Sequence, residues 1–106
     1  MNSTTTHSNG ITTQDILDGY DNPEWLGWGY FGERQGWLTS DDPECPAQPE
    51  RVAQVDMAIV AEANRRRWTA RRLFRFLNSR DGRHFADAMF GCDAPIADVK
   101  TWMGRA

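Results

Sequence analysis

Residues 49–77 read PERVAQVDMAIVAEANRRRWTARRLFRFL, and this segment carries the clearest helical signal in the chain. Its first half holds an apolar stripe at the spacing of a helix face, made by Val52, Val55, Ile59 and Ala63 and widened by Met57 and Val60. Proline is favoured at the first helical position, so we expect a helix that begins at Pro49 and runs to about Arg67. Thr69 is a suitable N-cap for a second helix that ends near Leu77 or Asn78.

Two more helices are expected after this pair. A turn over Asn78–Gly82 leads to a helix that ends near Gly91 and places Phe85, Ala86, Met89 and Phe90 on one side. Asp93 can cap a fourth helix, whose apolar stripe is Ile96, Val99, Trp102 and Met103. The predicted fold class is therefore mostly α, a small helical domain built on three to four C-terminal helices.

The N-terminal half is expected to wrap around these helices. Thr12 and Asp15 have the spacing of a helix start, and Gly19 ends that short element. The expected organisation is a flexible arm at residues 1–10 and a single small domain at 11–106, divided into an N-terminal wrap at 11–50, with an acidic linker at 40–50, and a helical core at 51–106.

The segment 25–38, WLGWGYFGERQGWL, is rich in aromatic residues and glycine. Its four glycines argue against a regular helix, so we expect an irregular segment. It could form a short β-hairpin that pairs Tyr30-Phe31 with Trp37-Leu38, or a compact loop with aromatic anchors. Its large side chains either complete the core or bind a partner, and the candidates for partner binding are Trp25, Trp28, Tyr30 and Trp37.

Composition places the chain among globular proteins. Of its 106 residues, 40% are hydrophobic and 25% are charged, which is neither disordered nor collagen-like composition. No apolar run is long enough for a membrane span and no secretory signal is visible, so we expect a cytoplasmic protein without a membrane partner. The two cysteines, Cys45 and Cys92, lack the spacing of a zinc site, and we expect no metal and no cofactor.

The charges are strongly segregated along the sequence. Residues 1–62 hold 11 acids and 2 bases, whereas residues 63–83 hold 8 arginines and 1 acid. The net charge of −3 therefore conceals a concentrated basic block. At 100° per residue, Arg71, Arg72 and Arg75 fall on one face of their helix, opposite its apolar side.

This basic block suggests binding to an anion. Guanidinium groups suit phosphate and carboxylate, so we expect a small non-enzymatic regulatory or accessory protein that contacts nucleic-acid phosphates. The candidate residues are Arg65, Arg66, Arg67, Arg71, Arg72, Arg75, Arg80 and Arg83. Two alternatives stay open: a protein-interaction module with an acidic partner, such as an inhibitor, adaptor or phage-like assembly component, and an arginine face that is solvated or paired with the chain's own acids.

Other functional patterns are weak. The helices on either side of Asn78–Gly82 fit a DNA-reading helix-turn-helix poorly, because the expected turn is long and few polar side chains could read bases. His84 beside Asp81 or Asp87 could act as a base, but a lone histidine near a helix start is more often structural. The letters GWGYFG match a dinucleotide fingerprint without the strand and helix that it needs. We therefore expect neither catalysis nor a small-molecule substrate.

Overall fold

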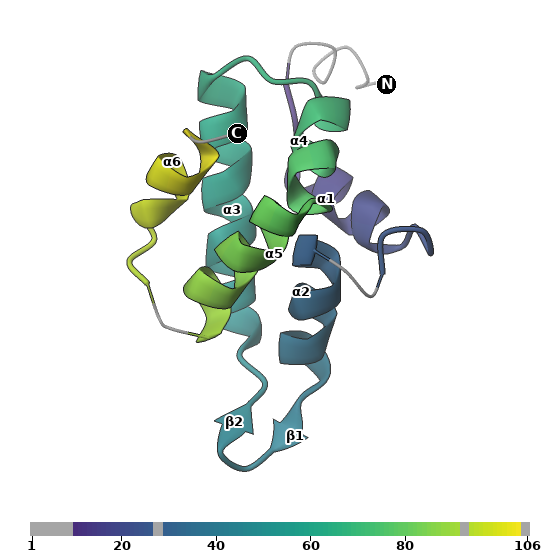
Figure 1. The fold of residues 1–106 in the computed structure, drawn as a ribbon, viewed down its shortest axis with the longest axis vertical. Coiled ribbons are helices and arrows are strands. Elements are labelled where there is room, and N and C mark those ends of the chain that lie inside the picture. The colour runs from purple at the N-terminus through teal and green to yellow at the C-terminus, as the bar shows by residue number, and fades with distance from the viewer. Residues whose placement is uncertain (1–9, 27–28, 92–93, 105–106) are drawn as a thin grey trace.

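The computed structural model describes residues 10–26, 29–91 and 94–104, and Figure 1 shows its arrangement. The helices are α1 (Thr13–Tyr20), α2 (Gly29–Thr39), α3 (Pro49–Arg65), α4 (Ala70–Leu77), α5 (Arg80–Ala86) and α6 (Asp98–Met103), and a π-helical turn (Asp87–Gly91) follows α5. Two short strands, β1 (Asp41–Asp42) and β2 (Cys45–Pro46), join α2 to α3. The long helix α3 runs through the molecule, with α6 on one side and α1 and α2 on the other (Figure 1).

The mostly helical fold class is confirmed, and α3 and α4 form where the sequence predicts them. Pro49 is the first residue of α3, which ends at Arg65. Arg67 then takes a left-handed backbone conformation, with φ of 59°, and so lies outside the helix. Thr69 caps α4 by accepting a hydrogen bond from the Arg72 N–H at 3.1 Å.

The connection between α4 and α5 is shorter than expected. The prediction of a turn over Asn78–Gly82 is wrong, because α5 begins at Arg80 and only Asn78 and Ser79 separate it from α4. Ser79 makes this possible: its hydroxyl accepts from the Gly82 N–H at 3.1 Å and donates to the Phe76 carbonyl at 2.6 Å. One side chain thus caps both helices at the turn.

The aromatic segment is also more regular than predicted. Residues 29–39 form helix α2 instead of an irregular segment or a hairpin over 30–38. Tyr30, Phe31 and Arg34 are buried against the neighbouring helices, and this packing outweighs the helix-weakening effect of the glycines. The hairpin lies instead inside the expected acidic linker, where Asp41 pairs with Pro46 and Asp42 with Cys45.

The core is a single cluster that draws on both halves of the chain. Fully buried large side chains come from every helix: Ile16, Tyr30, Phe31, Ile59, Leu73, Leu77, Phe85 and Met103. The start of the described chain is held to α3, because the Asn64 side chain accepts from the Ile11 N–H at 2.6 Å and donates to the Ile11 carbonyl at 2.8 Å. Apart from Gly10, the predicted flexible arm lies outside the described residues.

Within the described ranges, none of the helices has the length and apolar character needed to cross a membrane.

Candidate nucleic-acid interface

The outer face of α4 carries three arginines. Arg71, Arg72 and Arg75 are exposed, while Leu73, Phe76 and Leu77 on the same helix are buried. Among the residues that the structure describes, no carboxylate forms an ion pair with these three guanidinium groups. The Arg72 guanidinium lies over the Trp68 ring, 4.6 Å from its centroid, which orients this cation without neutralising it.

A shallow groove of about 570 Å³ follows this face, and we call it the α4 groove. It is lined by Trp68, Thr69, Arg71, Arg72, Arg75, Phe76, Ser79 and Asp81. Aromatic rings form part of its wall and three guanidinium groups surround it. The groove can therefore accept an anionic chain along an amphipathic surface.

A second groove of about 680 Å³, the α5 groove, meets the first at Ser79. It is lined by Gly29, Asn78, Ser79, Arg80, Arg83, His84 and Asp87. Together the two grooves are lined by five arginines and two aspartates. The basic surface therefore continues from α4 around the turn onto α5.

Other candidate arginines are paired within the chain. Arg65 and Arg66 lie three and four residues after Glu62 and contact its carboxylate at 2.7 and 2.6 Å. The hydrogen bond from Arg65 holds the pKa of Glu62 below its usual value, against the opposing effect of burial, and Arg66 lowers it further. For these two residues, the alternative of pairing with the chain's own acids describes the structure better than a free cationic face does.

Arg83 and Arg67 belong neither to the exposed face of α4 nor to the ion pairs with Glu62. The Arg83 guanidinium lies 3.8 Å from the Glu33 carboxylate, and its side chain is 47% exposed. Arg67 is exposed just after α3.

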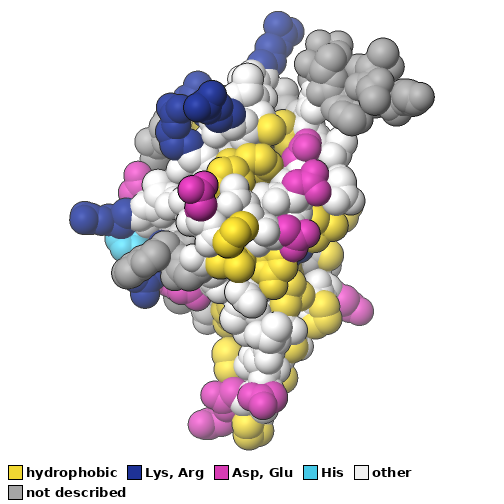
Figure 2. Space-filling model, turned by 90° about the vertical axis from the view of Figure 1, so that its right-hand side faces the viewer, with side chains coloured by type: hydrophobic (Ala, Val, Ile, Leu, Met, Phe, Trp, Pro, Cys, Tyr) yellow, Lys and Arg dark blue, Asp and Glu magenta, His cyan; other side chains and the backbone are white. Residues whose placement is uncertain are grey.

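Figure 2 shows the Lys and Arg side chains at the top and left of the molecule, whereas Asp and Glu gather at its lower tip and over the central and right-hand part of this face. The charge segregation seen in the sequence is thus partly kept in space.

Of the aromatic residues proposed for partner binding, the three that the structure describes lie in the core or pack against it. Tyr30 has no exposed surface. Trp25 is partly buried and packs against Phe31, with ring centroids 5.6 Å apart. Trp37 is also partly buried, against Phe90. Trp28 lies outside the described residues.

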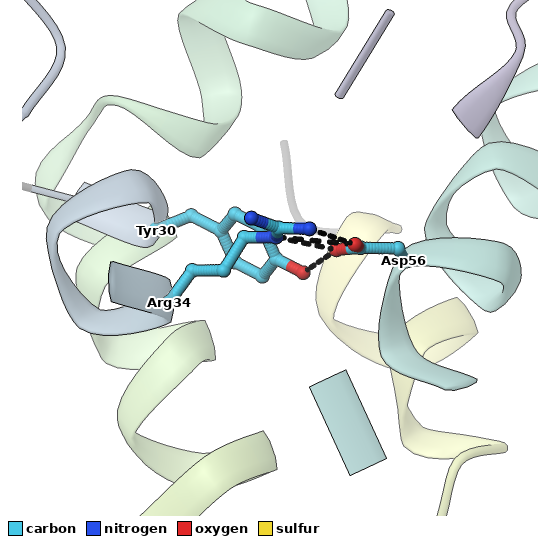
Figure 3. Close-up of polar contacts among 3 residues, drawn as sticks. All are labelled: Tyr30, Arg34 and Asp56. Carbon is cyan, nitrogen blue, oxygen red and sulfur yellow. Dashed lines mark hydrogen bonds and ion pairs between the residues drawn. The ribbon is translucent and has the colours of Figure 1, made fainter. Parts of the chain in front are cut away.

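A buried polar cluster links α2 to α3, and sequence reasoning missed it. Arg34 donates to Asp56 through its Nε at 3.1 Å and through a terminal nitrogen at 2.8 Å, and the Tyr30 hydroxyl donates to the same carboxylate (Figure 3). Both charged side chains are only 7% exposed. Burial raises the pKa of Tyr30, and the adjacent Asp56 raises it further, so the hydroxyl keeps its proton. An aspartate inside the apolar stripe between Val55 and Ile59 was the available signal for a buried partner.

Glu33 marks the contact between α2 and the end of α5. Burial raises the pKa of Glu33, the neighbouring Asp87 raises it further, and Arg83 opposes these effects. A raised pKa means that ionised Glu33 is less favourable in the folded protein than in the unfolded chain, so its ionisation costs stability as pH rises above the usual value of 4.5.

We therefore expect the Glu33→Gln variant to match the wild type in stability near pH 4 and to exceed it at pH 7. Thermal unfolding of both proteins at the two pH values measures this difference. A variant that is less stable at pH 7 would contradict the expectation, because it would mean that the contact with Arg83 outweighs the unfavourable burial and the repulsion from Asp87.

In the part of the chain that the structure describes, no group of three or more His, Cys, Asp or Glu side chains could hold a metal ion. Cys45 is a free thiol, and Cys92 lies outside the described residues.

Comparison of the chain with protein-family models, with curated proteins and with solved structures gave no match. Function must therefore be inferred from the surface itself.

Proposed function

We propose that this protein is a non-enzymatic binding protein that contacts nucleic-acid phosphates through Arg71, Arg72 and Arg75 on α4, extended by Arg80 on α5. Exposed guanidinium groups that lack a carboxylate partner among the described residues are suited to phosphate oxygens. Contacts of this kind position a nucleic acid without reading its sequence.

The observation that carries this proposal is the placement of the arginines on α4. Arg71 and Arg72 lie in the first turn of the helix, where the helix dipole disfavours cations, and this turn has no acidic residue. Arg71 and Arg75 are also like charges four residues apart, which is locally unfavourable. Arg72 has its contact with the Trp68 ring, but among the described residues no carboxylate offsets these costs. Local costs without a compensating ion pair are typical of residues retained for binding.

An acidic protein partner is the alternative ligand for the same arginines. Its carboxylates would meet the same guanidinium groups, but it would lack the regular charge spacing of a nucleic-acid backbone. If this protein bound an acidic protein but no nucleic acid, that result would favour the alternative.

Charge reversal on α4 tests the proposal. We expect Arg71→Glu to weaken binding of a short fluorescent DNA duplex about tenfold at low salt, and the double variant Arg71→Glu/Arg75→Glu to abolish it. An acidic residue is favourable in the first turn of a helix, so the Arg71 variant should fold. Fluorescence anisotropy measures affinity, and circular dichroism checks the fold.

Lys100→Glu is the matched control, because it makes the same change in net charge on α6. In Figure 1, α6 lies on the opposite side of α3 from α4. We expect this control to bind like the wild type, apart from a small long-range electrostatic effect. Equal losses in the two single variants would show that binding depends on net charge alone, and would contradict a specific role for α4.

A further inference from the structure

The α5 groove has a different chemical character from the α4 groove beside it. Apart from Gly29, every side chain that lines it is polar, and it joins the α4 groove at Ser79. Its volume of about 680 Å³ falls within the range of small-molecule pockets, about 300–1,000 Å³. Gly29 allows close packing behind it: its φ is 68°, and a Cβ there would lie 2.5 Å from the Leu77 carbonyl oxygen.

One helical row supplies most of the groove's functional groups. Arg83 and His84 are adjacent, each lies three or four residues from Arg80 and from Asp87, and all four residues are exposed. The row therefore presents cations at one end, an imidazole ring in the middle and a carboxylate at the other end. Asp87 is also the first residue of the π-helical turn, and such turns are frequent at functional sites.

The wall of the groove contains an acceptor without a donor. The side-chain oxygen Oδ1 of Asn78 is buried and has no hydrogen-bond partner among the described residues. Leaving a buried acceptor unsatisfied is unfavourable, and native proteins rarely do so without a reason. A ligand that carries N–H groups could remove this cost, with a small adjustment of the Asn78 side chain.

These groups match the parts of a nucleotide. Arg80 and Arg83 suit a phosphate, His84 offers a ring on which a base can stack, and the oxygens of Asn78 and Asp87 can accept from amino groups at a base edge. Carboxylates accept from cytosine N4 in this way. In a duplex the faces of a base are stacked and its Watson–Crick edge is paired, so only an unpaired base can stack on His84 and present that edge to the groove.

We propose that the α5 groove holds one unpaired base of a single-stranded nucleic acid whose backbone lies along the α4 groove. This inference rests on the proposed function, since the arginines of α4 supply the neighbouring phosphate contacts. It adds a preference for single strands that carry bases over strands that carry phosphates alone.

An abasic strand separates base binding from phosphate binding. The probes are a fluorescent oligodeoxycytidine of about 12 nucleotides and a strand of the same length and charge that lacks bases. We expect the wild type to bind the cytidine strand about tenfold more tightly. We expect His84→Ala/Asp87→Ala to bind both strands alike, while Gln54→Ala, an exposed change on α3, keeps the wild-type difference. Thermal unfolding verifies that each variant is folded.

The possible results separate the two proposals. Equal, salt-dependent binding of both strands by the wild type would overturn the base pocket and leave phosphate binding intact. A wild-type preference that persists in the folded double variant would also overturn the assignment to this groove. If neither strand binds at low salt, the proposed function fails, and the base pocket fails with it.

Discussion

Replacing Asp56 with alanine is expected to lower the free energy of unfolding by about 3–5 kcal/mol, one of the two largest effects that we expect from a single substitution. The change leaves the Arg34 guanidinium buried without a counter-charge and removes the acceptor of the Tyr30 hydroxyl. Since α2 and α3 meet at this cluster, the loss should affect the packing of the whole domain. Urea unfolding followed by circular dichroism measures the change.

A variant that removes all the polar groups of the cluster provides the control. In Tyr30→Phe/Arg34→Met/Asp56→Leu no buried charge is left unpaired, so we expect it to regain most of the stability lost in Asp56→Ala. A cost below about 1 kcal/mol for Asp56→Ala would instead mean that Arg34 finds water in the folded protein, as exposed ion pairs contribute only about that much.

The second large effect is expected for Gly82→Ala, with a cost of about 3 kcal/mol. A Cβ at this position would lie 2.3 Å from the carbonyl oxygens of both Phe76 and Leu77, so α5 would have to move away from α4. Because backbone atoms create the clash, a change of side-chain rotamer cannot relieve it. The same displacement would separate the α4 and α5 grooves at Ser79.

Gly36→Ala is the matched control for this prediction. Gly36 lies within α2, and a Cβ there would meet no atom within 4 Å. Alanine is the better helix former, so this variant should be more stable by about 0.5–1 kcal/mol. Thermal unfolding should therefore shift in opposite directions for the two glycine substitutions. Equal effects would contradict the close approach of α4 and α5.

The helices that the sequence predicts correctly are those with a strong local signal. The stripe of α3 and the cap of α4 depend on residues close together in the chain, so periodicity and capping rules find them. Helix α2 was missed because its glycines weaken it locally, and it is held by contacts distant in sequence, which include the burial of Tyr30 and Phe31 and the ion pair of Arg34 with Asp56. Local propensity does not contain that information.

The same distinction applies to the candidate interface. Helical spacing placed Arg71, Arg72 and Arg75 on one face, and the structure leaves all three exposed. The pairing of Glu62 with Arg65 and Arg66 follows three- and four-residue spacing and could have been read from the sequence. The α5 groove could not be read from the sequence, because it brings Gly29 next to the turn between α4 and α5, about fifty residues further along the chain.

The salt dependence of DNA binding tests most directly whether the α4 arginines contact phosphates. Affinity for a short duplex, measured from low to physiological salt, should fall with a slope of about −3 in log Kobs against log salt concentration, as expected for three to four phosphate contacts. Arg71→Glu should reduce the magnitude of that slope by about 1. Binding that is independent of salt, or no binding at low salt, would contradict the proposal that this arginine face binds nucleic acid.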